Sequence, residues 1–440
     1  MNDKPNILFL MSDEHRADVT GFGGNPVIRT KTLDMLAETG AVFTNAYTPS
    51  PVCIPGRQCL MAGQFPRTCG VEHGSQDLPP NYMTFARQLS LYGYDTVACG
   101  KLSHRGEDQM QGWMTRIGSD AIISPSFLKG RIMAQTKRKP VNQKWSDSKE
   151  IMRAGIGNSG YVTDRYTVTG AINFIDNYFN SSWWDREKRD NPLLLKISLV
   201  QPHYPYLAIE EKFNYYLNRV KPYIKERPFD HPFLGGTRRV IPGVDVTERD
   251  IRRATAAYYG MIETVDDLFA EVLDKLVAVG EDIDNWLVIY AADHGEMLGQ
   301  HGVWEKQKFF EGSARVPLII RYPAKFGEKK IINQNVSLCD IFATLCDICG
   351  IPIPQGLDSR SLVPLLKGKS EDWDNEAISQ FEGVCLMIKQ DNLKYHYYSD
   401  FPEVLIDLEN DPNETANVID NSEYSEAVAR FRKRRKELNY

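Results

Sequence analysis

The side chains best suited to chemistry in this sequence directly follow short apolar segments. Acids, histidines and a lysine come after four such segments: Asp13, Glu14 and His15; Lys101 and His104; His203; Asp293 and His294. Carboxylates and imidazoles bind divalent cations and carry protons, and lysine binds anionic groups. Ordinary strand ends would carry turn formers such as glycine, asparagine or proline alone. The pattern therefore indicates one functional site assembled from several segments.

The apolar segments that precede these residues are predicted to be strands. They span residues 7–11, 96–99, 193–200 and 286–291, and a fifth spans 317–321. Amphipathic helices are predicted at 33–39, 84–92, about 163–178 and about 248–279. This alternation is typical of an α/β protein with a largely parallel sheet and helices on both faces. Ligands of such sheets bind beyond the carboxyl ends of the strands, where we expect the polar residues to meet.

The C-terminal part of the chain has a different pattern. Short, closely spaced strands are predicted at 377–381, 384–389, 393–398 and 404–407, followed by a helix at about 425–438. A hairpin turn at 390–392 makes these strands antiparallel. We therefore expect a catalytic domain over residues 1–368 and a C-terminal subdomain over 369–440.

A cysteine motif near the start of the chain is its most specific signal. Cys53, Pro55 and Arg57 form Cys-x-Pro-x-Arg, with Leu60 and Gly63 further on. Alone, the pentapeptide would indicate only a buried cysteine before a turn proline. It resembles the signature of the type I, formylglycine-dependent sulfatases of the alkaline phosphatase superfamily. The signature is incomplete: Gly56, Ala62 and Gln64 stand where serine, threonine and arginine are commoner.

Further segments resemble that family in the expected order along nearly the whole chain. They are the opening strand to Asp13, the Gly-Lys-x-x-His element at 100–104, the His-x-Pro element at 203–205, the second metal segment from Asp293 to Lys306, and the tail at 405–412. The resemblance implies an alkaline phosphatase-like fold: a large, mixed, mostly parallel sheet flanked by helices, with a small C-terminal antiparallel sheet and helix. It also implies that a formylglycine-generating or sulfatase-maturating enzyme oxidises Cys53 to formylglycine.

The resemblance also implies a role for each matching residue. The metal ligands would be Asp13, Asp293, His294 and formylglycine 53, with Glu14 standing where a second aspartate is usual. The expected ion is Ca²⁺, with Mg²⁺ or Mn²⁺ as alternatives. In the catalytic set, Arg57 holds the nucleophile, Lys101 and Lys306 bind sulfate oxygens, His203 is the general acid, and His104 is the base that expels sulfate.

The chemistry of sulfate esters agrees with such a site. A sulfate monoester carries negative charge and repels an anionic nucleophile, whereas a hydrated aldehyde (a gem-diol) offers a neutral hydroxyl that a metal helps to deprotonate. Slow ester hydrolyses require barrier reductions on the order of 20 kcal/mol. One cation at about 4 Å contributes roughly 4 kcal/mol at an effective dielectric constant near 20. A metal ion and several basic groups are therefore expected together.

The expected activity is hydrolysis of a sulfate monoester, on a small molecule or an oligosaccharide, to an alcohol and sulfate. Sulfated sugars and aryl sulfates are the leading substrates. One alternative is a phosphonate or phosphate ester hydrolase of the same superfamily. Another is an inactive anion-binding homologue that keeps an unmodified Cys53.

Other segments are candidates for the walls of the substrate cleft. His15, His73 and His301 lie near the motifs in the sequence. Two long polar connections, 130–160 and 221–245, have lengths typical of functional covers or mobile segments. We expect both the histidines and these connections beside the substrate.

Composition excludes several other classes of protein. The 440 residues include 52 basic and 58 acidic side chains, so the net charge of −6 does not fit a nucleic-acid binder. No apolar run has the length of a membrane span, and residues 6–11 form a predicted strand without the features of a signal peptide. We expect no membrane partner and a cytoplasmic location, or export if a signal has been removed. The eight cysteines are expected as buried free thiols, with Cys346 and Cys349 on a core helix.

Overall fold

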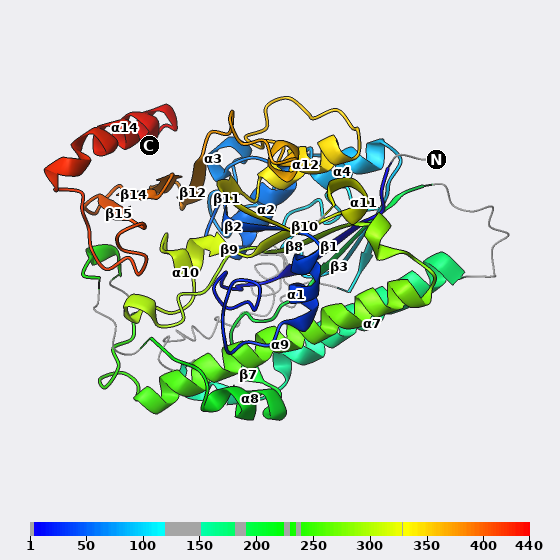
Figure 1. The fold of residues 1–440 in the computed structure, drawn as a ribbon, viewed down its shortest axis with the longest axis horizontal. Helices are drawn as coiled ribbons and strands as arrows, with labels where there is room; N and C mark the ends of the chain where they lie inside the picture. The colour runs from blue at the N-terminus through cyan, green and yellow to red at the C-terminus, as the bar shows by residue number, and fades with distance from the viewer. Residues whose placement is uncertain (1–3, 119–150, 181–190, 224–228, 235–238, 328) are drawn as a thin grey trace, which may run out of the picture.

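The computed structural model describes residues 4–118, 151–180, 191–223, 229–234, 239–327 and 329–440. Within these ranges, nine strands form one large sheet (Figure 1). Its order is β11 (Lys330–Ser337), β2 (Ala41–Tyr47), β10 (Leu318–Arg321), β8 (Leu287–Ala292), β1 (Ile7–Ser12), β6 (Leu193–Ser198), β3 (Asp95–Gly100) and β4 (Thr115–Ile117), with β9 (Arg315–Val316) paired to β2.

The centre of this sheet is parallel. β1 pairs in parallel with both β6 and β8, and β6 pairs in parallel with β3. β10 runs antiparallel to β8 and β2, which makes the sheet mixed. All residues of β1 are buried because helices cover both faces, as is usual for parallel sheets. The predicted α/β class and its mixed, mostly parallel sheet are confirmed.

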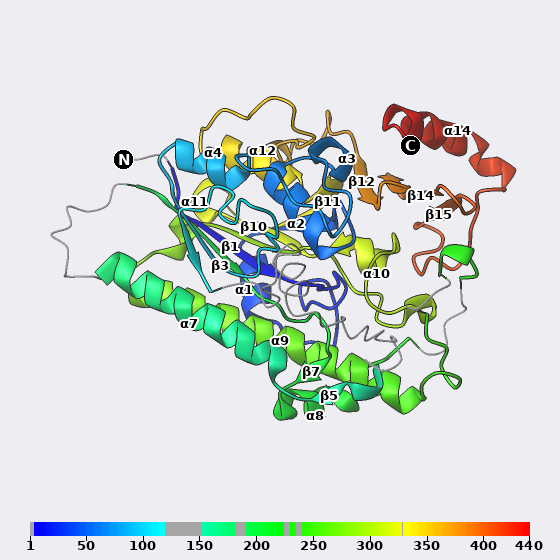
Figure 2. The same cartoon turned by 180° about the vertical axis from the view of Figure 1, so that it is seen from behind.

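Alternate residues of β1 enter two different cores. Phe9 points into a core shared with helices α2 (Cys53–Ala62), α4 (Phe85–Leu91) and α12 (Asp340–Ile348). Leu10 points into the opposite core, with α1 (Lys31–Glu38), α7 (Ser159–Asn180) and α9 (Glu248–Ala278). Figures 1 and 2 show these two helical layers on opposite sides of the sheet. The period of two along the strand therefore fixes a three-layer architecture.

The C-terminal part forms the predicted small sheet. Four described strands pair antiparallel in the order β12 (Glu376–Phe381), β13 (Cys385–Gln390), β14 (Leu393–Tyr398) and β15 (Val404–Asp407). Helix α14 (Ser425–Glu437) packs on this sheet through Val428 and Phe431. In both views this unit lies at one end of the large sheet.

Several elements differ from the sequence prediction. The edge strand β11 and its neighbour β2 were not among the five predicted strands. The Cys-x-Pro-x-Arg segment, for which no helix was predicted, forms the beginning of helix α2. Proline is tolerated there because the first amides of a helix have no partner within the helix.

All eight cysteines are free thiols, as predicted; seven are buried, whereas Cys53 is only half-buried. Cys346 lies on the buried helix α12, and Cys349 caps this helix. None of the helices in the described ranges combines the length and apolar character that a bilayer span requires.

Candidate active site

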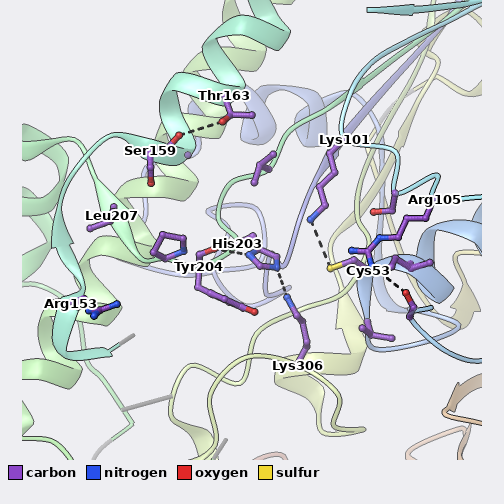
Figure 3. Close-up of a pocket in the computed structure, with 17 residues that line it drawn as sticks. Cys53, Lys101, Arg105, Arg153, Ser159, Thr163, His203, Tyr204, Leu207 and Lys306 are labelled. Atoms are coloured by element: carbon purple, nitrogen blue, oxygen red, sulfur yellow. Dashed lines mark hydrogen bonds between the residues drawn. The ribbon is translucent and has the colours of Figure 1, made fainter. Parts of the chain in front are cut away.

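The site lies where the carboxyl ends of four adjacent strands meet. β8, β1, β6 and β3 are consecutive in the sheet, and their polar extensions converge beside the N-terminus of α2. A pocket of about 760 Å³ opens over this point, and its lining includes Cys53, Lys101, His203 and Lys306 (Figure 3). The parallel order of the strands therefore brings distant sequence positions into one site.

Cys53 is the first residue of α2 and is half-buried. Its Sγ lies 3.1 Å from His294 Nε2, 3.7 Å from Asp13 Oδ1 and 3.9 Å from Lys101 Nζ. Burial and the Asp13 carboxylate oppose ionisation, yet Lys101, Lys306 and His294 together lower the pKa of the Cys53 thiol to about 5. The surroundings of residue 53 therefore favour negative charge.

Arg57 lies one helical turn further along α2 and holds the site together. Its side chain is 1% exposed, and Nε and Nη2 donate to Asp293 Oδ2 at 2.6 Å and Asp13 Oδ2 at 2.9 Å. Nη1 donates to Ser198 Oγ and to the Lys101 carbonyl, both at 2.7 Å. The guanidinium therefore ties α2 to the ends of β1, β8, β6 and β3.

The acidic residues fit a divalent cation. One ligand atom each from Asp13, Cys53, Asp293 and His294 lies within 4.8 Å of the others, as expected for donors around one hard cation. Arg57 binds the Oδ2 atoms of both aspartates, whereas both Oδ1 atoms lie within 4.0 Å of His294 Nε2. His294 Nδ1 donates to the Gly295 carbonyl at 2.9 Å, which leaves Nε2 for a metal.

Glu14 lies next to this set but faces a different partner. Its Oε2 accepts a hydrogen bond from Lys306 Nζ at 2.7 Å, and its Oε1 is buried without a hydrogen bond from any described residue. Burial and the neighbouring Glu296 raise the pKa of Glu14 to about 8, against the opposing charge of Lys306. With Asp13 and His203, Glu14 forms a second group of potential ligands.

His203 and Lys306 form a pair above Glu14. His203 Nδ1 lies 2.7 Å from the Tyr204 carbonyl, so this nitrogen carries the proton and donates. Its Nε2 therefore accepts from Lys306 Nζ at 2.6 Å. Burial, followed by the charges of Lys306 and Lys101, lowers the pKa of His203 to about 4, so its ring is neutral at pH 7.

Not every candidate residue lines the pocket. His104 is buried and is not a lining residue, and its Nδ1 lies 3.1 Å from the Gln109 carbonyl. His15 is held in the core by Tyr290 and by the Val19 carbonyl. His301 packs between Phe229 and Phe310, and the exposed His73 is not a lining residue either. The three histidines expected beside the substrate therefore lie elsewhere.

The long connections contribute unequally to the pocket. Residues 130–150 of the first connection lie outside the described residues, but Arg153, Ser159 and Gly160 line the pocket. No described residue of the second connection, 221–245, lines it. Sequence reasoning also missed Arg105, which lines the pocket directly after the His104 motif. Its position directly after His104, beyond the end of the same predicted strand, is the sequence signal that indicates it.

The fold and the site together define a class of protein. A mixed sheet covered on both faces, with a nucleophile position, a buried acidic cluster and lysines at its strand ends, is the arrangement of a metal-dependent ester hydrolase of the alkaline phosphatase superfamily.

Comparison with known families identifies the particular branch. The family model described as Sulfatase matches residues 5–351, and the model described as N-sulphoglucosamine sulphohydrolase, C-terminal, matches residues 299–440. The chain belongs to the sulfatase family and is a sulfuric ester hydrolase.

Curated relatives cover almost the whole chain. It is 31% identical over 433 residues to a choline-sulfatase of Rhizobium meliloti (strain 1021), which covers 95% of this chain and 83% of the relative. It is 29% identical over 461 residues to an arylsulfatase of Clostridium perfringens, covering 98% and 93% of the two chains.

Solved structures share the fold at low sequence identity. A phosphonate monoester hydrolase of Agrobacterium radiobacter matches with a TM-score of 0.79 at 23% identity, covering 99% of this chain and 95% of that chain. A structure described as a complex with its substrate D-glucosamine-2-N,6-O-disulfate matches with a TM-score of 0.78 at 19% identity, covering 99% and 97%.

Proposed function

We propose that this sulfatase hydrolyses the sulfate monoester of a sugar or an aryl alcohol, with residue 53 as a formylglycine nucleophile. The observation that carries the proposal is the position of Cys53 at the N-terminus of α2, within 3.9 Å of Asp13, His294 and Lys101. A helix N-terminus and three neighbouring polar groups suit an oxygen nucleophile that attacks an anionic ester.

Asp13, Asp293 and His294 are proposed to hold Ca²⁺ together with residue 53. Carboxylate oxygens are the ligands that hard cations prefer, and Arg57 fixes the orientation of both aspartates. When bound, such an ion lowers the pKa of a coordinated hydroxyl and neutralises charge on the sulfate. Glu14 is proposed as a further ligand; a shift of its carboxylate away from Lys306 would free Oε2.

Lys101 and Lys306 are proposed to bind the sulfate oxygens. Both side chains are largely buried at the pocket floor, 12% and 5% exposed. Each is held by a carboxylate, Asp13 for Lys101 and Glu14 for Lys306. Placed ammonium groups need little reorganisation when charge develops on the sulfate.

The leaving alcohol is proposed to receive its proton from His203 as the general acid. Against the effect of burial, Cys53 and Glu14 raise the pKa of Lys306, so Lys306 remains the cation that binds the sulfate. His203 is neutral at pH 7 in the free site, and its Nε2, which faces Lys306 Nζ, would take up a proton when substrate binds and pass it to the alcohol. His104 is proposed as the base for the second half of the reaction, in which sulfate departs.

A maturating enzyme is proposed as the one protein partner. Pro55 and Arg57 of the pentapeptide are buried in the folded chain, so recognition of this segment requires access before α2 packs. Intact-protein mass spectrometry of native material tests this step: oxidation to formylglycine exchanges sulfur for oxygen with loss of two hydrogens.

The Cys53→Ala variant tests the nucleophile. We expect a loss of about 10³-fold or more in kcat for aryl sulfates, because no other described side chain occupies this position. The melting temperature should stay near that of the parent, since residue 53 is half-buried at a helix start. Cys385→Ala, which removes a thiol outside the pocket, is the control for kcat. Retention of more than trace activity by Cys53→Ala would reject residue 53 as the nucleophile.

Because a phosphonate monoester hydrolase shares this fold, the class of ester that is hydrolysed needs a direct test. Rates on matched aryl sulfates, phosphates and phosphonates should rank sulfate first. Much faster turnover of phosphate or phosphonate esters would instead assign the chain to the alternative ester class.

A further inference from the structure

The turn that carries His203 is held by a side chain that does not line the pocket. Residues 200–203 follow strand β6, and the backbone N–H of His203 donates to the Val200 carbonyl at 3.0 Å. Asp164, on helix α7, accepts hydrogen bonds from the backbone N–H groups of Val200 at 2.6 Å and of Gln201 at 3.0 Å. The carboxylate of Asp164 therefore fixes the two peptide groups with which this turn begins.

Both oxygens of Asp164 are used in these contacts. Oδ1 accepts from Val200, whereas Oδ2 accepts from the backbone of Gln201 and from its side-chain Nε2, the latter at 3.1 Å. Asp164 is fully buried, and burial raises the pKa of its carboxyl group to about 6 against the hydrogen bonds that it accepts. At pH 7 the group is therefore an anion, and hydrogen bonds to an ionised acceptor are stronger than those between neutral groups.

The anchored peptide groups lead to the reaction centre by two routes. The peptide group between Val200 and Gln201 donates its N–H to Asp164 and accepts the N–H of His203 on its carbonyl oxygen. The next carbonyl, that of Gln201, accepts the backbone N–H of Asp13 at 3.3 Å. Asp13 also has Arg57 and Lys101 as partners, so the backbone of His203 depends more on the Asp164 contact than Asp13 does.

Helix α7 also packs closely against this turn. At Gly160, one helical turn before Asp164, a Cβ would lie 2.9 Å from Gln201 Cγ. Ser159 and Thr163 of the same helix line the pocket (Figure 3). The first turns of α7 therefore contribute both to the pocket wall and to the support of the turn that carries His203.

The ring of His203 follows the backbone of its turn. Its Nδ1 donates to the carbonyl of the adjacent Tyr204, so this contact moves together with the turn and does not fix the ring independently. Its Nε2 contacts the mobile ammonium group of Lys306. A shift of the peptide groups at Val200 and Gln201 would therefore move the ring nitrogen that faces the pocket.

We propose that Asp164 is a positioning residue that holds His203 where it protonates the leaving alcohol. The inference rests on the proposed function, in which His203 is the general acid, and adds a residue that does not touch the substrate. General acid catalysis requires hydrogen-bond reach between the acid and the leaving oxygen. Displacement of the turn should therefore impair proton transfer while the nucleophile on α2 stays in place.

Para-substituted phenyl sulfates, from nitro to methoxy, test the proposal on the metal-loaded, formylglycine-containing enzyme. Nitrophenolate leaves with little help from an acid, whereas methoxyphenolate depends on protonation. In Asp164→Asn, one acceptor oxygen remains and an NH₂ group faces the other N–H donors. We expect kcat/KM to fall about tenfold further for methoxyphenyl sulfate than for nitrophenyl sulfate, because a displaced acid gives up part of its contribution.

Asp266→Asn is the matched control. Asp266 on α9 is a buried aspartate that accepts the backbone N–H groups of Thr32 and Leu33 of helix α1, both at 2.9 Å, and burial raises its pKa to about 6 as well. None of these three residues lines the pocket. Asp266→Asn should therefore lower the melting temperature without changing how kcat/KM depends on the leaving phenol.

Two further variants show whether the effect passes through His203. In a His203→Ala background, which lacks the acid, Asp164→Asn should no longer change the dependence on the leaving phenol. Gln201→Met removes only the side-chain hydrogen bond to Asp164 and keeps both backbone bonds. It should give a smaller effect in the same direction, and it provides the test if Asp164→Asn does not fold.

Nuclear magnetic resonance of isotope-labelled histidines follows the position of the ring without turnover. The ring nitrogen signals of His203 are identified by their loss in His203→Ala. They should shift in Asp164→Asn, or in Gln201→Met, and stay unchanged in Asp266→Asn.

The outcomes separate this inference from the proposed function. An equal loss of kcat/KM across the phenyl sulfates, a leaving-group effect that persists without His203, or unshifted His203 signals would overturn the inference. If the parent enzyme turns over none of the sulfates while the His203 signals shift as expected, the proposed function is rejected and the positioning of His203 by Asp164 is supported.

Discussion

At the scale of single residues, the two oxygens of each buried aspartate in the site contact different partners. Arg57 binds Oδ2 of both Asp13 and Asp293, while the Oδ1 atoms remain directed to Cys53 and His294. Burial opposes ionisation of Asp13, but Lys101 and Arg57 hold its pKa well below the usual value. Buried charges persist only where such partners are present.

Removal of the metal should lower activity and stability together. A cation that binds the folded chain alone adds about 2.7 kcal/mol at a free concentration of about 100 Kd. Dialysis against a strong chelator should therefore reduce both kcat and the melting temperature, and Ca²⁺ should restore both. In Asp13→Asn the melting temperature should no longer respond to chelator. Indifference of the parent enzyme to chelator would count against the acidic cluster as a metal site.

His301 should make stability depend on pH. Burial, followed by Lys394, lowers the pKa of His301 to about 4, while the unfolded value is 6.5. Between these values the unfolded chain binds more protons, so stability rises with pH and is lost as pH falls from 6.5 towards 4. The full contribution is roughly 3 kcal/mol.

Denaturant unfolding of His301→Asn across this range provides the measurement. Asparagine tolerates the φ of 56° at this position. The slope of the unfolding free energy against pH reports how many more protons the unfolded chain binds than the folded chain. In His301→Asn this difference should be smaller than in the parent by up to one proton. A loss of stability from repacking that does not depend on pH would leave the slope unchanged. Identical slopes for His301→Asn and the parent would contradict the lowered pKa of His301 as a source of pH-dependent stability.

At the scale of elements, helix α2 connects the nucleophile position to the core. Nine of its ten residues are buried, so the helix has little freedom to move relative to the sheet. Gly56 is the point of closest approach: a Cβ there would lie 2.9 Å from the Ser50 carbonyl and 3.2 Å from Thr48 Oγ1. The departure from the common serine therefore has a steric reason in this chain.

Gly56→Ser should destabilise the protein although it restores the commoner residue of the signature. Crowding against the backbone of residue 50 should cost about 1–3 kcal/mol and displace Cys53, lowering kcat. Gly74→Ala is the matched control for stability, because its methyl group would meet only Ile54 Cδ1 at 3.9 Å. An unchanged melting temperature for Gly56→Ser would show that α2 can shift without cost.

At the scale of the whole molecule, a buried ionic cluster joins the C-terminal sheet to the large sheet. Lys394 on β14 is fully buried and pairs with Glu311 of helix α10 (Glu311–Ala314) and with Glu414. Tyr47 and Phe310 share an apolar cluster with residues of β12 to β15. We propose that residues 1–368 and 369–440 fold as one cooperative unit despite their different sheets.

Lys394→Met should weaken this junction strongly. Loss of the ammonium leaves the buried Glu414 without its cationic partner, whereas Glu311 keeps its pair with Arg315. Breaking a buried pair in this way typically costs about 3–5 kcal/mol. Adding Glu414→Gln should recover part of the loss. Lys329→Met, which breaks the exposed pair with Glu38, should change stability by at most about 1 kcal/mol. A separate early unfolding transition of the C-terminal part in calorimetry would contradict the single unit.

The amino-acid sequence by itself determined the layered α/β fold and the set of residues at the strand ends. Periods of two and 3.6 residues are local properties of the chain, so the central strands and the long helices could be predicted from them. Spacing within the Cys53 motif and the order of the later motifs predicted the family, which the comparisons confirmed.

Tertiary structure alone decided which of these residues meet and what their charges become. His15 and His301 are near the motifs in sequence but are held in cores, whereas Arg105 and Arg153 reach the pocket from segments 48 residues apart. The neutral state of His203 follows from burial beside two lysines. Such effects depend on distances between residues remote in sequence, and no local pattern contains those distances.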